Sequence, residues 1–372
     1  RALYRTPGKN LPALPRARYD RRSETARGLV SSALAQGIQK LSNPVLVNTL
    51  RGEVIENRHR GAIAVCDPGG RLVQAWGEVD ALVYPRSAIK PLQALPLVES
   101  GAADHFQLTD AEIALACSSH NAETAHTDTV QSWLARIKLD EDALECGAHA
   151  PLHAKTAESL LINHIAPGRI HNNCSGKHTG MLTISRFLDE DTHGYIEREH
   201  PAQQRWFDVL GELAGMDMRS LPWSRDGCGI PVIAMPLKAI ATAFARIAVP
   251  DDLPTARGSA VDRITTAMAS HPFMVAGTDR LCTQIMELTG RRVIVKTGAD
   301  GVYTAMLRDQ GLGIAVKIDD GSGLAAEVAI LAVLNHLQAL HRDEMDQLAE
   351  RCRVPILNTR GVLTGYREPA GL

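Results

Sequence analysis

The sequence predicts an α/β protein of the α+β kind, in which an antiparallel sheet is flanked by helices in a two-lobed architecture. Three observations lead to this fold class. Strand-like segments lie near both ends of the chain, the stretch between them is mainly helical in pattern, and polar loops rich in Gly and Pro separate the helices. Strands from both ends can meet in one sheet, with the helical stretch inserted between them.

The first strands are predicted to form a hairpin. The folded region is expected to open near Pro44, and residues 61–66 form a short apolar run. Asp67-Pro68-Gly69-Gly70 is typical of a turn, and residues 71–76 can return as the partner strand. This hairpin supplies the N-terminal part of the predicted sheet.

Helical patterns follow the hairpin. A short helix is predicted to begin near Ser87, and Pro91 and Pro96 should make it irregular. The middle of the chain, from residue 110 to about residue 286, is mainly helical in pattern. The helices expected there span residues 111–117, 124–137, 202–214, 237–247 and 260–269.

The period changes again near the C-terminus. Residues 292–296, 301–307 and 311–318 have the pattern of strands, and the last two are separated by a turn. A long apolar helix is predicted over residues 324–340, preceded by the loop and cap Asp319-Asp320-Gly321-Ser322-Gly323. These strands complete the predicted antiparallel sheet.

Composition limits the classes of partner. The chain has 372 residues, 45% of them hydrophobic and 22% charged, with a formal net charge of −2 and 4% aromatic residues. Neither the charge nor the aromatic content suggests a nucleic-acid or membrane-surface partner. No apolar run reaches the roughly 18–20 residues that span a bilayer. A small-molecule substrate is the expected partner.

The N-terminal 43 residues differ from the rest. Residues 1–43 hold seven arginines and only two acidic residues, without the apolar core of a signal peptide. We expect a basic, disordered extension there, with a transit segment as the alternative, and a single two-lobed domain over residues 44–372. The seven cysteines are scattered and odd in number, which favours a reducing, cytoplasmic location.

Three short motifs predict serine–lysine chemistry. Ser87 and Lys90 are three residues apart, so on a helix they share one face, and lysine can serve as the base that a serine nucleophile needs. Ser119-His120-Asn121 follows an apolar helix, and Lys296-Thr297-Gly298 ends a strand. Ser-x-x-Lys, Ser-Asp-Asn and Lys-Thr-Gly together are typical of serine β-lactamases and penicillin-binding proteins. Here His replaces Asp, and the spacing between the first two motifs is short.

A second feature is a pair of cysteine-containing segments. Asn172 to His178 and Asp226-Gly227-Cys228-Gly229 each place a thiol among polar residues and glycine. Two thiolates could hold Zn²⁺, with Lys177 and His178 as the nearest further ligands, or the two cysteines could be unrelated loop residues. Asp226 could orient a substrate ammonium group, or could be a surface aspartate.

These motifs resemble those of the thermolabile, rhizobial-type L-asparaginases, the asparaginase II family. The resemblance covers residues from about 45 to the end, and includes Glu56 to Gly61, Arg86 to Pro91, Cys117 to Asn121, Asn172 to His178 and Arg225 to Gly229. It implies a fold similar to serine β-lactamases and glutaminases, a homodimer, and hydrolysis of L-asparagine to L-aspartate and ammonia.

The resemblance also implies roles for individual residues. Two Ser–Lys pairs fall on Ser87 with Lys90 and on Ser119 with Lys296, although Lys317 could replace Lys296. A zinc site, completed by water and not required for the chemical step, falls on Cys174, Lys177 and Cys228. Substrate-binding positions fall on Arg86, His178 and Asp226.

The expected mechanism is acyl transfer, with Ser87 attacking the side-chain amide of asparagine. Two rival functions share some of these features. A penicillin-recognising serine hydrolase or peptidase would use the same three motifs. A non-catalytic domain that binds zinc or an amino acid would keep the fold but release no ammonia.

Overall fold

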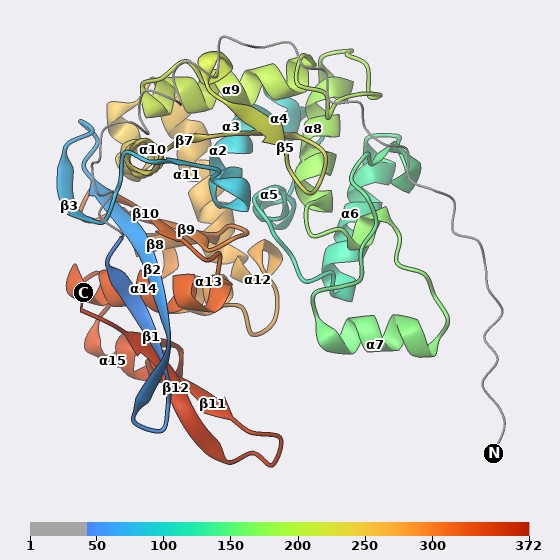
Figure 1. Cartoon of the computed structure of the whole chain (residues 1–372). Helices are drawn as coiled ribbons and strands as arrows, with labels where there is room; N and C mark the ends of the chain where they lie inside the picture. Colours follow the sequence, from blue (N-terminus) through green and yellow to red (C-terminus); the bar gives the residue numbers. More distant parts are fainter. Residues whose placement is uncertain (1–42, 372) are drawn as a thin grey trace, which may run out of the picture. The chain divides into compact units, whose positions relative to one another are not determined.

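A long strand, β2 (Val54–Cys66), joins the two parts of an eight-stranded antiparallel sheet in the computed structural model, which describes residues 43–371 (Figure 1). Its first half pairs with β1 (Val45–Arg51), and its second half pairs with β10 (Leu312–Ile318) and β3 (Leu72–Trp76). The burial of β2 changes at the point where its partner strands change: residues 54–60 are largely exposed, and residues 61–66 are buried. The predicted hairpin is confirmed.

The strand order confirms that distant parts of the chain close one antiparallel sheet. The order is β11-β12-β1-β2-β10-β9-β8, with β3 beside β2. The remaining bounds are β8 (Val293–Thr297), β9 (Val302–Leu307), β11 (Val354–Leu357) and β12 (Leu363–Pro369). β1, β11 and β12 were not predicted, because polar residues interrupt the apolar pattern of β1 and β12, and the four residues of β11 include Pro355.

Two helices cover the buried part of the sheet. Both α10 (Leu237–Ala248) and α14 (Gly323–His336) pack against β9 and β10, whose residues are almost all buried (Figure 1). α14 ends four residues before the predicted limit of 340, because Gln338 adopts a left-handed backbone conformation with φ of 53°. A sheet covered by helices is the predicted fold class, which is confirmed.

The helical region contains every helix predicted between residues 110 and 286, within a few residues of the expected ends, together with short ones that the pattern missed. Its helices are α4 (Ala102–His105), α5 (Asp110–Ala116), α6 (Thr124–Arg136), α7 (Ala154–Ile162), α8 (Ser175–Phe187), α9 (Pro201–Ala214), α11 (Thr255–Ser270), α12 (Pro272–Val275) and α13 (Leu281–Thr289). Two small sheets interrupt it, formed by β4 (Leu82–Val83) with β7 (Met235–Pro236) and by β5 (Trp223–Arg225) with β6 (Pro231–Ile233).

The irregular helix predicted at Ser87 consists of three pieces. They are η1 (Arg86–Ile89), α2 (Lys90–Gln93) and α3 (Leu95–Glu99). Pro91 and Pro96 each stand in the first turn of a new piece, where the missing N–H costs no hydrogen bond. The prolines thus divide the segment and leave Ser87 in a single 3₁₀ turn.

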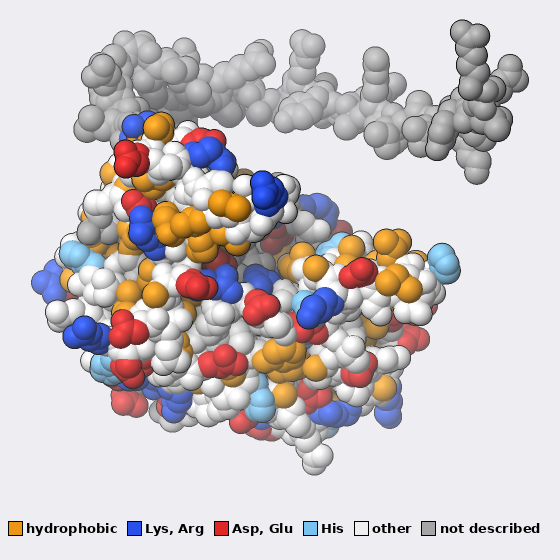
Figure 2. All heavy atoms as spheres, turned by 90° about the horizontal axis from the view of Figure 1, so that it is seen from below, with side chains coloured by type: hydrophobic (Ala, Val, Ile, Leu, Met, Phe, Trp, Pro, Cys, Tyr) orange, Lys and Arg blue, Asp and Glu red, His pale blue; other side chains and the backbone are white. Residues whose placement is uncertain are grey.

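Exposed apolar side chains occur in separate places on the described part of the molecule. They include Leu161 and Ile162 on α7, and Val54, Leu357 and Leu363 near the ends of the long hairpins. Figure 2 shows apolar side chains in distinct groups on the face seen from below Figure 1. No helix among residues 43–371 has both the length and the apolar character to cross a membrane. The predicted N-terminal extension lies outside the described residues apart from Asn43, and the domain boundaries stay a prediction.

Candidate active site

Two buried lysines share one serine hydroxyl. The Lys90 Nζ atom lies 3.1 Å from the Ser119 Oγ atom, and the Lys296 Nζ atom lies 2.9 Å from the same oxygen. Ser119 is 4% exposed and each lysine is 1% exposed. The structure therefore brings together three of the four residues predicted to be catalytic. We call Lys90, Ser119 and Lys296 the serine–lysine cluster.

Three segments far apart in the sequence build this cluster. Lys90 begins α2, Ser119 lies in the loop after α5, and Lys296 lies on β8. The loop is fixed by its backbone, since Ser119 N–H donates to the Val275 carbonyl at 3.0 Å and His120 N–H donates to the Asn173 carbonyl at 3.2 Å. Its hydroxyl is thus held between the lysines by a rigid backbone.

His120 stands where the β-lactamase type of motif has Asp, and its bonds explain the difference. Its Nε2 atom lies 2.9 Å from the Ser175 Oγ atom, and its Nδ1 atom accepts the Ala122 N–H at 3.0 Å. Burial lowers the pKa of His120 well below its ordinary value, so the ring is neutral. Both ring nitrogens are used within the protein, and His120 stabilises the loop that carries Ser119.

The sequence left Lys296 and Lys317 open as partners of Ser119, and the structure places Lys296 there. The Lys317 Nζ atom donates instead to the carbonyls of Asp300 at 2.7 Å and Ile318 at 2.6 Å. Lys317 therefore ties the loop that carries Asp300 to the end of its own strand, β10. Its ammonium group has no hydrogen bond to Ser119 in the described structure.

Lys296 is the lysine whose charge state the surroundings change. Burial, followed by the nearby Lys90 ammonium, lowers the pKa of Lys296 to about 7. Burial disfavours the charged form, and a second cation a few ångströms away disfavours it further. At neutral pH Lys296 can therefore be an unprotonated amine, as a general base must be.

Ser87 lies at a more open position than Ser119. It is half-buried in η1, and its hydroxyl makes no hydrogen bond to any residue between 43 and 371. The end of β8 lies directly against this turn: a Cβ atom on Gly298 would stand 2.9 Å from the Pro85 carbonyl oxygen and 3.1 Å from the Ala88 nitrogen. Glycine after Lys-Thr permits this close approach.

Arg86, which precedes Ser87, is held by two carboxylates. Its Nε atom donates to Asp226 Oδ1 at 2.7 Å, and its Nη1 atom contacts Asp300 Oδ2. Arg86 has φ of 52°, which only an over-determined site maintains in a residue with a Cβ. Two of the predicted substrate-binding residues, Arg86 and Asp226, are therefore neighbours, and Asp300 joins them.

The two cysteine segments also meet. Cys174 caps the N-terminus of α8, Lys177 lies in the first turn of that helix, and Cys228 lies in the tight turn between β5 and β6. The Lys177 Nζ atom is 3.0 Å from Cys228 Sγ, and Lys90 Nζ is 3.2 Å from Cys174 Sγ. We call Cys174, Lys177 and Cys228 the cysteine–lysine cluster, and Lys90 links it to the serine–lysine cluster.

Charges in the cysteine–lysine cluster are complementary. A hydrogen bond from Cys174, and then the Lys177 ammonium, lower the pKa of Cys228 well below that of a free thiol, although burial opposes this. The same hydrogen bond and burial raise the pKa of Cys174 to about 12. Burial alone would lower the pKa of Lys177, but Cys228 and Cys174 overcome it and raise that pKa.

The donor atoms of this cluster fit a zinc site with three protein ligands and one position left for water. Two sulfurs and one amine converge, and catalytic zinc sites in proteins have three protein ligands and a water. Among the described residues, no group of three or more His, Cys, Asp or Glu side chains converges on one point. Any metal at this position therefore needs the lysine as its third ligand.

His178 has one ring nitrogen free for a ligand. Tyr195 OH accepts the Glu145 N–H at 2.9 Å and lies 2.7 Å from His178 Nδ1. The tyrosine hydroxyl can then donate to Nδ1, which leaves the proton of the neutral ring on Nε2. Burial lowers the pKa of His178 well below its ordinary value, and its buried Nε2 atom has no hydrogen-bond partner among residues 43–371.

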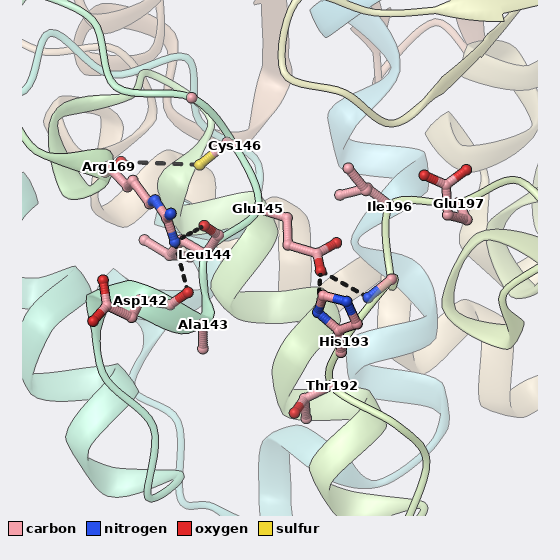
Figure 3. Close-up of a pocket in the computed structure, with 12 residues that line it drawn as sticks. Asp142, Ala143, Leu144, Glu145, Cys146, Arg169, Thr192, His193, Ile196 and Glu197 are labelled. Carbon is pink, nitrogen blue, oxygen red and sulfur yellow. Dashed lines mark hydrogen bonds and ion pairs between the residues drawn. The ribbon is translucent and has the colours of Figure 1, made fainter.

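A pocket of about 670 Å³ adjoins this network (Figure 3). In it the Glu145 carboxylate accepts the Gly194 N–H at 2.7 Å and lies 3.0 Å from His193. The Arg169 guanidinium donates to the carbonyls of Asp142 and Leu144. None of the predicted site residues lines this pocket, which is joined to His178 through Glu145 and Tyr195.

Comparison with protein families decides the class of protein. The model of the L-asparaginase II family matches residues 47–369. The chain belongs to the L-asparaginase II family. This confirms the resemblance drawn from the motifs. A search of curated proteins gives no match.

Several solved structures are similar to this asparaginase-family chain at low identity. Mglu in its native form is 15% identical with a TM-score of 0.42, and the alignment covers 77% of this chain and 66% of Mglu, just under two thirds of its length. A beta-lactamase from Mycobacterium bovis is 16% identical with a TM-score of 0.39, covering 74% and 94%. A putative beta-lactamase from Bacteroides dorei is 15% identical with a TM-score of 0.41, covering 83% and 97%.

Three residues of this asparaginase-family site were not found from the sequence. Tyr195 orients His178, Arg280 donates to the Asn121 side chain at 2.8 Å and to the Ser119 carbonyl at 3.4 Å, and Asp300 contacts Arg86. Tyr195 and Arg280 lie in stretches without motif or periodicity. Asp300 lies three residues after Thr297, so the Lys-Thr-Gly motif could have directed attention to it.

Proposed function

We propose that the protein hydrolyses L-asparagine to L-aspartate and ammonia through an acyl-serine intermediate. One observation carries the proposal: the Ser119 hydroxyl lies between two buried lysine amines, and the pKa of one of them is about 7. An unprotonated amine beside a hydroxyl can accept the proton that acyl transfer releases. Membership of the L-asparaginase II family supports asparagine as the substrate.

In this mechanism Ser87 is the nucleophile. Its oxygen bonds to the side-chain amide carbon of asparagine. Its proton moves to Lys90 as Lys90 passes one of its own protons to Ser119, and the Ser119 hydroxyl proton moves to the neutral amine of Lys296. Ser87 is favoured over Ser119 because its hydroxyl has no hydrogen bond to the residues that the structure describes, is more exposed, and is adjacent to Arg86. Backbone N–H groups around η1 and the Gly298 turn would stabilise the oxyanion.

Breakdown of the tetrahedral intermediate completes the first half. The C–N bond breaks, the stored proton moves to the leaving nitrogen, and ammonia departs. Water then attacks the aspartyl ester, with the same neutral amine accepting its proton, and Ser87 is regenerated. Keeping two lysines together serves both halves, because like charges keep one of them unprotonated.

The substrate would be held by the three predicted binding residues. Arg86 offers a guanidinium for the α-carboxylate, and Asp226 keeps that guanidinium in place. The buried Nε2–H of His178 is a donor without a partner, and a substrate oxygen would satisfy it. A small, doubly charged amino acid amide suits this set of groups.

Cys174, Lys177 and Cys228 would hold Zn²⁺, with water as the remaining ligand. When bound, the ion supplies fixed positive charge that tunes substrate binding and the geometry of the neighbouring groups. Loading requires Lys177 to lose a proton and Cys174 to become a thiolate, so protons are released on binding. Exhaustive chelation should weaken asparagine binding and leave a measurable rate; complete loss of turnover with an intact fold would contradict this role.

We further propose a homodimer in the cytoplasm. The exposed apolar residues of α7, Leu161 and Ile162, offer surface that a second copy could cover. All seven cysteines are free thiols, as suits a reducing compartment. Light scattering coupled to size-exclusion chromatography tests the dimer, and fractionation of the source cell tests the location.

Ammonia release from purified protein tests the function. L-asparagine should give ammonia and L-aspartate in equal amounts, and L-glutamine under the same conditions shows how selective the site is. A chromogenic β-lactam in a parallel assay should remain intact. Hydrolysis of the β-lactam without ammonia release would instead indicate a penicillin-recognising enzyme, and asparagine binding without turnover would indicate a non-catalytic domain.

A further inference from the structure

The loop after β8 brings a carboxylate to the arginine that precedes the nucleophile. Thr297 ends β8, and Asp300 follows three residues later in the turn toward β9. The Asp300 Oδ2 atom contacts Arg86 Nη1, while Asp226 Oδ1 accepts the Arg86 Nε proton at 2.7 Å. The guanidinium thus lies between two carboxylates that come from opposite sides of the site.

These two carboxylates differ in how much binding capacity they retain. The Asp226 side chain is 12% exposed, and its Oδ1 atom also accepts the Gly227 N–H at 2.7 Å. The Asp300 side chain is 66% exposed, and Arg86 is its only hydrogen-bond or ion-pair partner among residues 43–371. Asp300 is therefore the carboxylate with room for an incoming positive charge.

The position of Asp300 is fixed despite its exposure. Its φ is 54°, and the Lys317 ammonium donates to its carbonyl oxygen at 2.7 Å and to the Ile318 carbonyl at 2.6 Å. A lysine on β10 that donates to the Asp300 carbonyl in this way ties the Asp300 turn to the end of that strand. A carboxylate on a fixed backbone can recognise a ligand with little loss of conformational entropy.

We propose that Asp300 binds the α-ammonium group of the substrate while Arg86 binds its α-carboxylate. This inference rests on the proposed function and names the part of the substrate that the site recognises. In the free protein Arg86 and Asp300 pair with each other. A zwitterionic amino acid that enters between them replaces this one contact with two charge-assisted contacts. Arg86 then pairs with the substrate carboxylate, and Asp300 pairs with the substrate ammonium group.

The consequence is a requirement for a free α-amino group. Succinamate, which is asparagine without its ammonium group, would place its carboxylate on Arg86 and leave Asp300 unused. L-aspartate and succinate, the corresponding products, form a second matched pair. The two members of each pair differ only in the ammonium group. An effect of Asp300 on binding of that group therefore changes one member of the pair, whereas an effect through Arg86 or through the fold changes both.

Asp300→Asn is the decisive variant, because asparagine keeps the size and removes the charge. We expect kcat/KM for L-asparagine to fall about 10- to 100-fold, mostly through KM, since a hydrogen bond to a charged group is lost. The value for succinamate should change less than about threefold by the same reasoning. Asp208→Asn is the control: that carboxylate lies on α9, is 64% exposed and pairs with Arg219, and its loss should change kcat/KM for neither substrate.

Calorimetric binding of the products makes the test independent of turnover. Asp300→Asn should weaken L-aspartate binding by the same factor and leave succinate binding unchanged. Equal losses for both ligands, or no loss for either, would overturn the proposal. If the wild-type protein releases no ammonia from asparagine, the proposed function fails, and the ratio of aspartate to succinate affinities still decides the role of Asp300.

Discussion

Two buried lysines in this site, Lys296 and Lys177, have pKa values shifted in opposite directions. Both are almost fully excluded from water. The pKa of Lys296 falls to about 7, because burial and the Lys90 ammonium both oppose its charge. The pKa of Lys177 rises, because the sulfurs of Cys228 and Cys174 outweigh the same burial. Burial alone therefore does not determine the protonation of a lysine, and its neighbours decide the sign.

The opposite pKa shifts of Lys296 and Lys177 suit the two clusters to different chemical roles. The serine–lysine cluster holds an amine that can accept a proton near neutral pH. The cysteine–lysine cluster, without a metal, holds a thiolate and an ammonium that neutralise each other, and with a metal it holds a cation. Lys90 touches both clusters, at Ser119 Oγ and Cys174 Sγ. Substitutions on either side should therefore separate proton transfer from ion binding.

The largest effect is expected from Lys296→Met. Loss of the neutral amine should lower kcat by about 10²- to 10⁴-fold, the range that a positioned general base contributes, with little change in zinc content. Steady-state kinetics and elemental analysis measure the two quantities. Lys238→Met is the control, since that lysine is 45% exposed on α10 and pairs with Asp80. Near-normal kcat in Lys296→Met would remove the base from the mechanism.

A smaller effect on rate and a larger one on metal are expected from Cys228→Ser. The variant removes one of three donors, so zinc affinity should fall at least about 100-fold, whereas kcat should fall by less than it does in Lys296→Met. Cys66→Ser, at a buried thiol beneath α10, is the matched control. If both cysteine variants kept full zinc, the metal would lie elsewhere.

The pH profile sharpens the same comparison. Lys296 works unprotonated, so kcat/KM should rise about tenfold per pH unit below its pKa and level off above about pH 7. Arg280 is one of the cations that lower this pKa, so Arg280→Gln should raise it and move the rising part of the pH profile to higher pH. A rate that falls as pH rises through 7 would mean that the protonated amine is the active form.

The smallest effect concerns the packing of α8, the helix that carries Lys177 and His178. A Cβ atom on Gly176 would collide with the Leu115 carbonyl of α5, whereas on Gly180 its nearest contact would be Leu97 Cδ2 at 3.4 Å. Gly176→Ala should lower the free energy of unfolding by about 1–3 kcal/mol and the Tm by about 2–6 °C. Gly180→Ala in the same helix should raise the free energy of unfolding by up to about 1 kcal/mol, because the new methyl meets only ordinary contacts and alanine favours a helix interior over glycine. Thermal melts that rank the two variants the other way would contradict the close packing.

Much of the fold followed from local patterns, and the exceptions share a cause. Residues 61–66 and the strands at 292–318 are buried and apolar, so their pattern was visible, whereas the exposed strand at 72–76 was found through the turn before it. β1, β11 and β12 are half exposed, and their pairing with β2 and with one another makes them strands. Local sequence cannot show pairing between residues 47 and 369.

The site divides in the same way. Ser87, Lys90, Ser119 and Lys296 lie in short motifs, so they could be named, and their meeting could be expected. The preference for Lys296 over Lys317 depended on which lysine reaches Ser119. The register puts both on one face of the sheet, Lys296 opposite Thr304 and Lys317 opposite Val302, so their positions along and across the sheet decide which one does. Tyr195 and Asp300 act through contacts between distant loops, and such contacts leave no periodic trace in the sequence.

Trapping the acyl group tests the central claim most directly. Protein mixed with excess L-asparagine and quenched in acid within the first turnovers should yield one peptide with an aspartyl ester, on Ser87. The Ser87→Ala protein should give neither ester nor ammonia. An ester on Ser119, with Ser87→Ala turning over at the normal rate, would contradict the mechanism and make the hydroxyl between the two lysines the nucleophile.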